Sequence, residues 1–245
     1  WVDERVDKGG WDLNFLPHYL QYKYFKRVER KLLAQSDQVV VLTQRVVDEV
    51  VKLGVSSISK VTVIPCCADF NHFSLSSDTS KAKIKEAIGI PKESFVLGYL
   101  GSVGSMYLLD KTLLFFKMVL GKRVDAYILF ITNDTSKMQN LIIKNLPKDL
   151  HSSICIKSAN RNEVPLLIPI MDIMVSFIAP SYARMAASPT KIAECFAAGI
   201  PVISNDGIGD VDKIVNRLDA GEIVNSFSDE NLIKLSSKLD KISKK

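Results

Sequence analysis

The chain reads IMVSFI at residues 173–178 and SPTKIAECFAAGIPVIS at residues 188–204. The first run is apolar without alternation, which predicts a strand buried on both faces, as in a parallel sheet. The second run predicts a short helix followed by another strand. Ser188 is expected to be the N-cap of that helix, Pro189 fits its first position and Gly199 fits its end. This region therefore predicts one strand–helix–strand unit of a parallel α/β sheet.

The same alternation of apolar runs and amphipathic stretches extends over nearly the whole chain. The expected strands are 39–43, 60–64, 95–100, 126–132, 154–157, 173–178, 200–204 and 222–224. The other expected helices are 17–35, 44–53, 110–120, 136–146 and 228–242. We therefore predict an α/β fold of the doubly wound, Rossmann-like type, with a parallel sheet.

Charge and composition narrow the functional classes. The net charge of +5 comes from Lys and Arg spread along the chain without a dense basic block, which argues against nucleic-acid binding. A mildly basic surface favours acidic membranes or phosphate-bearing ligands. The four cysteines, at 66, 67, 155 and 195, match no zinc or redox spacing and fit a reducing compartment. We expect a cytoplasmic protein, with peripheral association at the inner face of the membrane as a further expectation.

The longest apolar stretch does not predict a membrane span. It covers residues 166–179, is interrupted by Pro169 and Asp172, and is too short to cross a bilayer.

The domain organisation is predicted from one polar, patternless stretch, 74–80, which we interpret as a linker. The segment before it has two strand–helix units, too few to close a core alone. We therefore predict a remnant of one Rossmann-like domain at residues 1–73, a linker at 74–82, and a larger Rossmann-like domain at 83–245. The sequence begins with Trp1 in the middle of a domain pattern, and we interpret the chain as a fragment.

The start of the helix after residue 188 is the first candidate ligand site. Ligands of open α/β sheets bind beyond the carboxyl ends of the strands, and this helix begins there. Its free backbone N–H groups and partial positive charge suit a diphosphate, with Ser188, Thr190 and Lys191 beside it. Glu194, one turn further, could accept hydrogen bonds from ribose hydroxyls. The alternative is a capped surface helix with a solvated Lys–Glu pair, which is the more common reason for such a pattern.

The glycine turn after strand 95–100 is the second candidate. Gly101 and Gly104 would let the backbone approach a ligand, and Ser102 and the amides could contact phosphate. The turn lacks the full GxGxxG spacing, and an ordinary Gly–Ser turn would read the same way.

Two further polar loops follow strands on the same predicted edge. They contain Asn133 in the first loop and Asn160 and Arg161 in the second, and they could contact a base or a sugar. Ordinary loop chemistry explains each of them equally well. The three histidines, at 18, 72 and 151, have no partner at metal or catalytic spacing and are interpreted as structural or surface residues.

Taken together, these segments resemble the retaining GT-B glycosyltransferases, the glycosyl transferases group 1 (family 4-like). Residues 61–73 (VTVIPCCADFNHF) resemble that family's V-x-V-I-P-N-G-V-D-x-x-x-F segment at the domain junction. Residues 188–204 resemble its P-x-K-x-x-E-x-x-A-x-G-x-P-V-I block. Residues 95–101 resemble its first donor-domain strand and glycine turn, and residues 29–43 its last acceptor-domain helix and strand.

The resemblance implies a transferase that moves a sugar from a nucleoside diphosphate sugar to a glycan or lipid-linked glycan acceptor. It makes residues 1–73 a remnant of the acceptor domain and residues 83–245 the donor-binding domain. It implies no cofactor besides the donor and no metal, since the sequence has no Asp-x-Asp motif, and it leaves the catalytic residues in the part that the chain lacks. The fragment is therefore expected to be inactive alone.

Two departures from the family pattern keep other functions open. The first glutamate of the family's Glu-x7-Glu pair would fall at Ala186, and Ser102, Val103 and Gly104 stand where the family has an arginine and a lysine. Lys191 and Arg161 are the candidates to supply the missing charge. The alternatives are a catalytically degenerate nucleotide-sugar-binding or scaffold protein, and a GT-B epimerase acting on a nucleotide-sugar.

Overall fold

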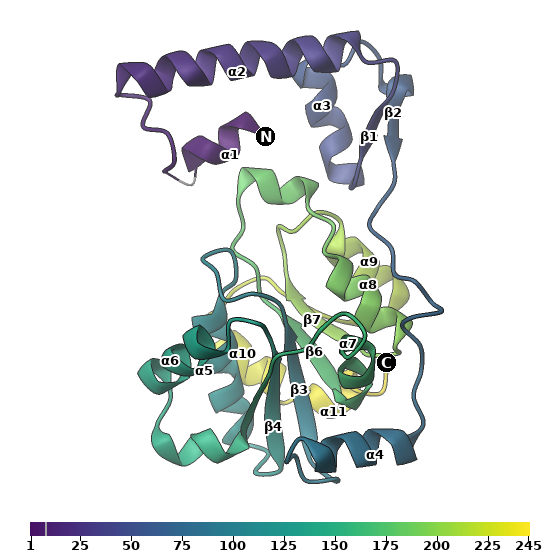
Figure 1. The fold of residues 1–245 in the computed structure, drawn as a ribbon. Helices are drawn as coiled ribbons and strands as arrows, with labels where there is room; N and C mark the ends of the chain where they lie inside the picture. The colour runs from purple at the N-terminus through teal and green to yellow at the C-terminus, as the bar shows by residue number, and fades with distance from the viewer. Residues whose placement is uncertain (8) are drawn as a thin grey trace. The chain divides into compact units, whose positions relative to one another are not determined.

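The computed structural model describes residues 1–7 and 9–245, and it divides the chain into two compact units (Figure 1). The first unit comprises Trp1–Cys66, Pro180–Ser188 and Gly207–Val211. The second comprises Cys67–Ala179, Pro189–Asp206 and Asp212–Lys245. Two short segments from the later part of the sequence thus belong to the first unit, although the sequence analysis places them in the range 83–245.

The second unit is built on a parallel sheet of six strands. The strands are β3 (Phe95–Leu100), β4 (Ala126–Ile131), β5 (Ile154–Lys157), β6 (Ile173–Ser176), β7 (Val202–Asn205) and β8 (Gly221–Val224). Their order is β5-β4-β3-β6-β7-β8, and every neighbouring pair is parallel. The order reverses between β3 and β6, which is the switch point of a doubly wound sheet. The predicted α/β class and all six strands of this sheet are confirmed.

One face of the sheet packs on the main hydrophobic core. The helices of this core are α5 (Leu109–Leu120), α6 (Thr135–Asn145), α10 (Asp229–Ser236) and α11 (Leu239–Ile242). Phe95, Leu97 and Tyr99 of β3 point into it at two-residue spacing, together with Phe115 and Phe116 of α5. Burial of both sheet faces explains why the strand sequences are continuously apolar.

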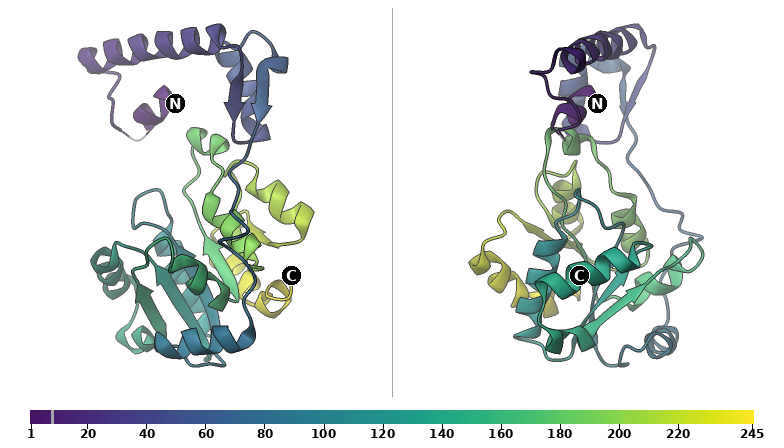
Figure 2. Two further views of the ribbon diagram at one scale, coloured as in Figure 1. Left: turned by 45° about the vertical axis from the view of Figure 1, so that its right-hand side comes forward. Right: turned by 60° about the vertical axis from the view of Figure 1, so that its left-hand side comes forward.

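Further helices complete the second unit, and Figure 2 shows helices on both sides of its sheet. They are α4 (Asp78–Ala87), α7 (Val164–Leu167), α8 (Thr190–Ala197) and α9 (Val211–Leu218), the last of which begins on Val211 of the first unit. Met171, just before β6, packs so closely on Gly98 that a Cβ at Gly98 would lie 1.9 Å from its sulfur. Gly98 is therefore required in β3 by this close approach.

The first unit contains the N-terminal helices and a two-stranded parallel sheet. Its elements are α1 (Val2–Asp7), α2 (Leu16–Gln35), β1 (Val39–Val41), η1 (Gln44–Val46), α3 (Val47–Leu53), β2 (Val61–Val63) and the 3₁₀ helix η5 (Tyr182–Ala186). Val39 pairs with Val61 and Val41 with Val63. A valine core, including Val46, Val47 and Val50, joins these elements.

Three local predictions differ from the structure. Helix α4 begins at Asp78, within the range 74–82 predicted as a linker, and Ser77 caps it by accepting a hydrogen bond from the Ser80 amide. Helices α1, α7 and α9 have no counterpart among the predicted helices. The predicted helix 228–242 is divided into α10 and α11. A short capped helix with few apolar positions gives little periodic signal, which is why α4 was missed.

Candidate functional site

A cavity of about 270 Å³ lies at the carboxyl ends of β3, β4 and β5 in the second unit. Its lining residues come from the last residues of β3 and β4, from the loops that follow the three strands and from the start of α7: Leu100, Gly101, Ser102, Ile131, Thr132, Asn133, Asp134, Ala159 and Val164. The cavity adjoins β3, which borders the switch point of the sheet, and ligands of open parallel sheets bind at this edge. The structure thus brings the predicted residues Gly101, Ser102 and Asn133 together around one hollow.

The glycine turn after β3 needs glycine at position 101. Gly101 has φ of +150°, and its amide donates to the Ile131 carbonyl at 3.1 Å. An added Cβ would lie 3.2 Å from Tyr99 Oη and 3.4 Å from Lys191 Nζ. The missing side chain therefore leaves room for the lysine ammonium.

The rest of the turn is anchored from both sides. The Tyr99 hydroxyl donates to the Ser102 carbonyl at 2.8 Å, and the Val103 amide donates to Asp134 Oδ2 at 3.0 Å. Asp134 also accepts from Lys137 Nζ at 2.7 Å, and these contacts lower the pKa of its carboxyl. The Ser102 side chain is exposed, and an added Cβ at Gly104 would meet open space.

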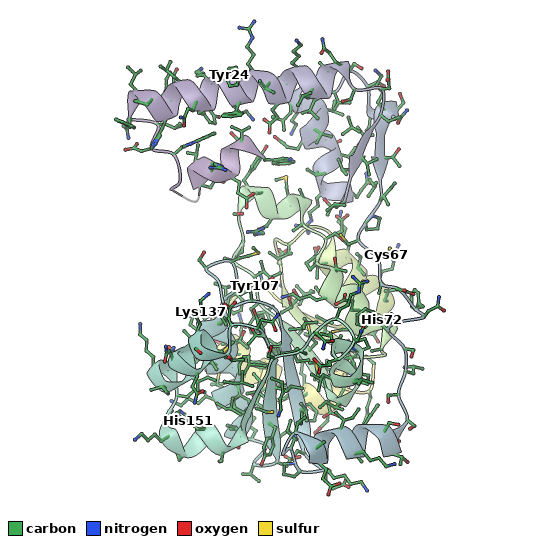
Figure 3. All side chains as sticks on the ribbon, viewed as in Figure 1. Tyr24, Cys67, His72, Tyr107, Lys137 and His151 are labelled. Carbon is green, nitrogen blue, oxygen red and sulfur yellow. The ribbon has the colours of Figure 1, made fainter. Side chains whose placement is uncertain are left out.

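Lys191, in the first turn of α8, extends to the end of β3. Its Nζ donates to the Leu100 carbonyl at 3.1 Å and lies 3.9 Å from the centre of the Tyr107 ring, a residue labelled in Figure 3. The Tyr99 ring is 5.3 Å away. Burial lowers the pKa of Lys191 to about 7, so both the ammonium and the neutral amine are populated near neutral pH. An anion bound beside it would favour the ammonium.

Glu194, one turn along α8, lies in a second polar group. Burial raises the pKa of its half-buried carboxyl, while Arg161 and His72 act in the opposite direction. The His72 ring donates from Nε2 to the Arg161 carbonyl at 3.0 Å. Arg161 and His72 thus act electrostatically on the predicted residue Glu194, and His72 is one that the sequence analysis interpreted as structural or surface.

The side-chain oxygens of the two predicted asparagines already accept hydrogen bonds from the protein. Asn133 Oδ1 accepts from the Ser158 hydroxyl at 2.7 Å. Asn160 Oδ1 accepts from the amides of Asn162 and Glu163, at 2.9 and 3.2 Å. Asn160 thus stabilises the turn before α7. Asn133 lines the cavity and keeps its amide nitrogen available to a ligand.

The family follows from a sequence comparison. Residues 80–245 match the profile of a family described as "Glycosyl transferases group 1". The chain belongs to this family. No curated protein matches the chain in a sequence search.

The folds of solved glycosyltransferases agree with this assignment. WaaG, a glycosyltransferase involved in lipopolysaccharide biosynthesis, superposes with a TM-score of 0.71 at 19% identity, over 94% of this chain and 61% of WaaG. HepE of Anabaena, solved in complex with UDP-glucose, gives 0.70 at 14% identity, over 89% and 58%. A glycosyltransferase from Rickettsia africae gives 0.66 at 21% identity, over 89% and 57%. The fold is therefore GT-B, and the chain spans about three fifths of the length of these proteins.

The prediction that Ser188 is the N-cap of α8 is wrong. Pro189 is the N-cap of α8, without a side-chain cap, and the Ser188 hydroxyl instead accepts a hydrogen bond from the Cys66 amide at 3.1 Å within the first unit. Thr190, the first residue of α8, is exposed. The fold brings the Ser188 hydroxyl to the Cys66 amide instead, and nothing in the sequence around residue 188 indicates that contact.

Ala186 occupies the position where the family pattern has its first glutamate. Ala186 ends η5 and contacts the valine core of the first unit. Among the residues that the structure describes, no group of three or more His, Cys, Asp or Glu side chains could hold a metal ion. No helix in the described part of the chain is both long and apolar enough to cross a membrane.

Two residues of the site were not predicted: Tyr107 and His72. Asp134 belongs to the polar loop 132–134 that the sequence placed at this edge, and it lines the cavity as that prediction expects. Tyr107 and His72 lie in segments whose sequence does not indicate a contact with Lys191 or Glu194.

Proposed function

We propose that this chain is the donor-binding part of a glycosyltransferase that moves a sugar from a nucleoside diphosphate sugar to a glycan or lipid-linked glycan acceptor. The observation that carries the proposal is the Lys191 ammonium, which is held at the Leu100 carbonyl on the border of the strand-end cavity. A buried cation next to a glycine turn and a helix start suits a diphosphate. The structural relative HepE was solved with UDP and with UDP-glucose, which supports this ligand class.

The roles of the residues follow from their positions. We assign the strand-end cavity to the nucleoside, Lys191 to the diphosphate and Glu194 to the ribose hydroxyls. In the reaction, the bond from the anomeric carbon to the diphosphate oxygen breaks and its electron pair leaves with the diphosphate. The acceptor hydroxyl forms the new bond and loses its proton. Lys191 would stabilise the charge that develops on the departing diphosphate.

Calorimetric titration of the chain with UDP, GDP and ADP tests the donor site. We expect one of the nucleotides to bind, and we expect Lys191→Ala and Glu194→Ala each to weaken that binding by about tenfold or more. Lys144→Ala, an exposed lysine on α6, is the matched control and should leave affinity unchanged. Folded wild-type chain that binds none of the three, or equal affinity in Lys191→Ala, would contradict the assignment.

One observation favours a second candidate, a nucleotide-sugar-binding protein without transferase activity. Ala186 stands where the family pattern has a glutamate, and this half-buried alanine packs against the valine core of the first unit. Nucleotide-sugar binding without any turnover of the bound donor in the presence of glycan acceptors would support this candidate. Release of the free nucleotide on addition of an acceptor would exclude it.

We also propose a peripheral contact with anionic membranes through helix α2. Its exposed side chains include both apolar and cationic residues: Leu16, Leu20, Tyr24, Lys23, Arg27 and Lys31. Tyrosines and basic residues side by side are typical of surfaces at the lipid headgroup level. Co-sedimentation should be stronger with vesicles containing an anionic lipid than with zwitterionic vesicles. Equal binding to both would contradict the charge-based part of the proposal.

A further inference from the structure

The Lys191 amine lies among groups that give it no anionic partner. Its Nζ donates to the Leu100 carbonyl at 3.1 Å and lies 3.9 Å from the centre of the ring of Tyr107, which Figure 3 labels. We infer that the diphosphate of the donor supplies the counter-charge, so that donor binding is coupled to the uptake of a proton by Lys191. The inference deepens the proposed donor site and rests on it.

The surroundings of Lys191 offer fewer partners than an ammonium can use. An ammonium has three N–H donors, and the Leu100 carbonyl accepts from one of them. The other contacts of Nζ are aromatic, with the Tyr107 and Tyr99 ring centres 3.9 and 5.3 Å away. Across residues 1–7 and 9–245, no carboxylate forms an ion pair with Lys191, and this includes Glu194 on the same helix. Because a desolvated charge without a counter-ion is costly, the protein without its donor favours the neutral amine more than water does.

The titratable groups nearby do not compensate the charge. Burial raises the pKa of the Tyr99 hydroxyl, and it raises the pKa of the Cys195 thiol, one turn along α8, to about 12. Both groups are therefore neutral near physiological pH. Asp134, in the loop after β4, is already paired with Lys137. In agreement with these surroundings, burial lowers the pKa of Lys191 to about 7.

An anion bound beside Nζ shifts this balance in one direction. The opposite charge favours the ammonium, so the pKa of Lys191 is higher in the complex than in the free protein. The complex then holds more protons than the free protein, and donor affinity weakens as pH rises above about 7. If the bound lysine stays fully charged, the uptake is about 0.5 proton at pH 7 and about 0.9 proton at pH 8. Affinity then falls about tenfold between about pH 7 and about pH 8.5.

Calorimetry in two buffers measures this uptake directly, because each proton taken up adds the ionisation heat of the buffer to the observed heat. The chain would be titrated with UDP-glucose, GDP-glucose and ADP-glucose in Tris and in HEPES, at about pH 7 and about pH 8, where carboxylates and histidines ordinarily titrate little. Nucleotide-sugars replace free nucleotides here, because a terminal phosphate itself titrates near pH 6 and the sugar ester removes that group.

Variants of the lysine identify the group that takes up the proton. Lys191→Arg keeps a permanent positive charge, so it should bind the donor without proton uptake and with the same affinity at both pH values. Lys191→Met should bind weakly and also without uptake. Lys144→Arg, at an exposed position on α6, is the matched control and should show the wild-type uptake. Circular dichroism checks that each variant is folded, and Lys191→Met supplies the comparison if Lys191→Arg is not.

The coupling and the donor site can fail separately. Uptake in the wild type that increases with pH and disappears in Lys191→Arg would support the coupling. If a nucleotide-sugar binds without proton uptake, or with equal uptake in wild type and Lys191→Arg, the donor site stands and the coupling is refuted. A folded chain that binds none of the three nucleotide-sugars would overturn both.

Discussion

Replacing Lys191 by methionine removes the buried ammonium and keeps an unbranched side chain of similar length. In the wild-type chain, burial lowers the pKa of Lys191 from its ordinary value of 10.5 to about 7. Between these values the folded chain carries a neutral amine and the unfolded chain carries an ammonium, so unfolding takes up a proton. The contribution of Lys191 to the free energy of unfolding therefore rises with pH across this window. Methionine has no such contribution.

The magnitude follows from the size of the window. Each pH unit above the folded-state pKa is worth about 1.4 kcal/mol, so the step from about pH 7 to about pH 9 gives at most ~2.7 kcal/mol. The Leu100 carbonyl and the Tyr107 ring favour the charged form and reduce this figure. We expect the wild type to gain about 1–2 kcal/mol of stability relative to Lys191→Met over that interval.

Urea unfolding curves recorded by far-UV circular dichroism at several pH values measure the effect. The double difference between wild type and variant cancels the titration of groups that do not interact with Lys191. Lys144→Met, at an exposed position on α6, should unfold in parallel with wild type at every pH. A wild-type-minus-Lys191→Met difference that stays constant between about pH 7 and about pH 9 would refute the claim that the ammonium is buried.

Four other substitutions test the donor domain and its site. Asn205→Ala should lower the free energy of unfolding by about 2–4 kcal/mol in urea titrations, because the buried Asn205 amide accepts from and donates to the backbone after β6, at 2.8 and 2.9 Å. Gly98→Ala should cost about 1–3 kcal/mol in the same assay, since its Cβ would overlap Met171, whereas Gly104→Ala should stay within about 0.5 kcal/mol. If Glu194 binds ribose as a carboxylate, wild-type affinity for UDP-glucose should fall as pH drops through its raised pKa, and Glu194→Gln should show weak affinity without that pH dependence.

The strands and main helices were predictable because their signals are local. The continuous apolar run 95–100 gave a strand with the observed bounds, since a strand buried on both faces needs apolar residues at nearly every position. The half-buried edge strand 154–157 was also predicted with its observed bounds. Gly199 was recognised as a helix end, and it has the positive φ of +71° that this position requires. The resemblance to the family likewise depends on short segments, such as 61–73 and 188–204.

The site itself was only partly predictable. The sequence placed Gly101, Ser102 and Asn133 at one edge, because the carboxyl ends of parallel strands lie together. It misassigned Ser188 as a helix cap, since a hydroxyl next to a helix start has a second option that depends on a residue more than a hundred positions away, Cys66.

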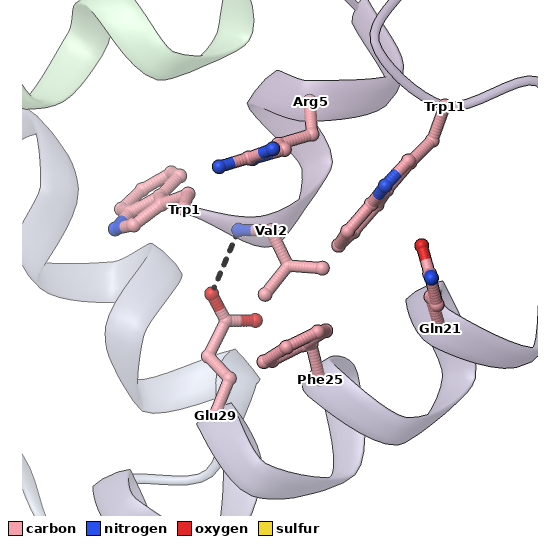
Figure 4. A pocket seen from close by; sticks show the side chains of 7 residues that line it. All are labelled: Trp1, Val2, Arg5, Trp11, Gln21, Phe25 and Glu29. Atoms are coloured by element: carbon pink, nitrogen blue, oxygen red, sulfur yellow. Dashed lines mark hydrogen bonds between the residues drawn. The ribbon is translucent and has the colours of Figure 1, made fainter. Parts of the chain in front are cut away.

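The sequence by itself determined the α/β class, the strands, the family and the edge of the sheet that carries the polar loops, since each depends on patterns within about twenty residues. Tertiary structure alone decided the electrostatic state of Lys191, whose hydrogen-bond partner Leu100 is 91 residues away. It also decided the cavity between α1 and α2 in the first unit (Figure 4), where Lys26 of α2 donates to Asp3 of α1. Both depend on desolvation and on contacts between distant residues, and a pKa or a cavity has no value until the chain has folded around it.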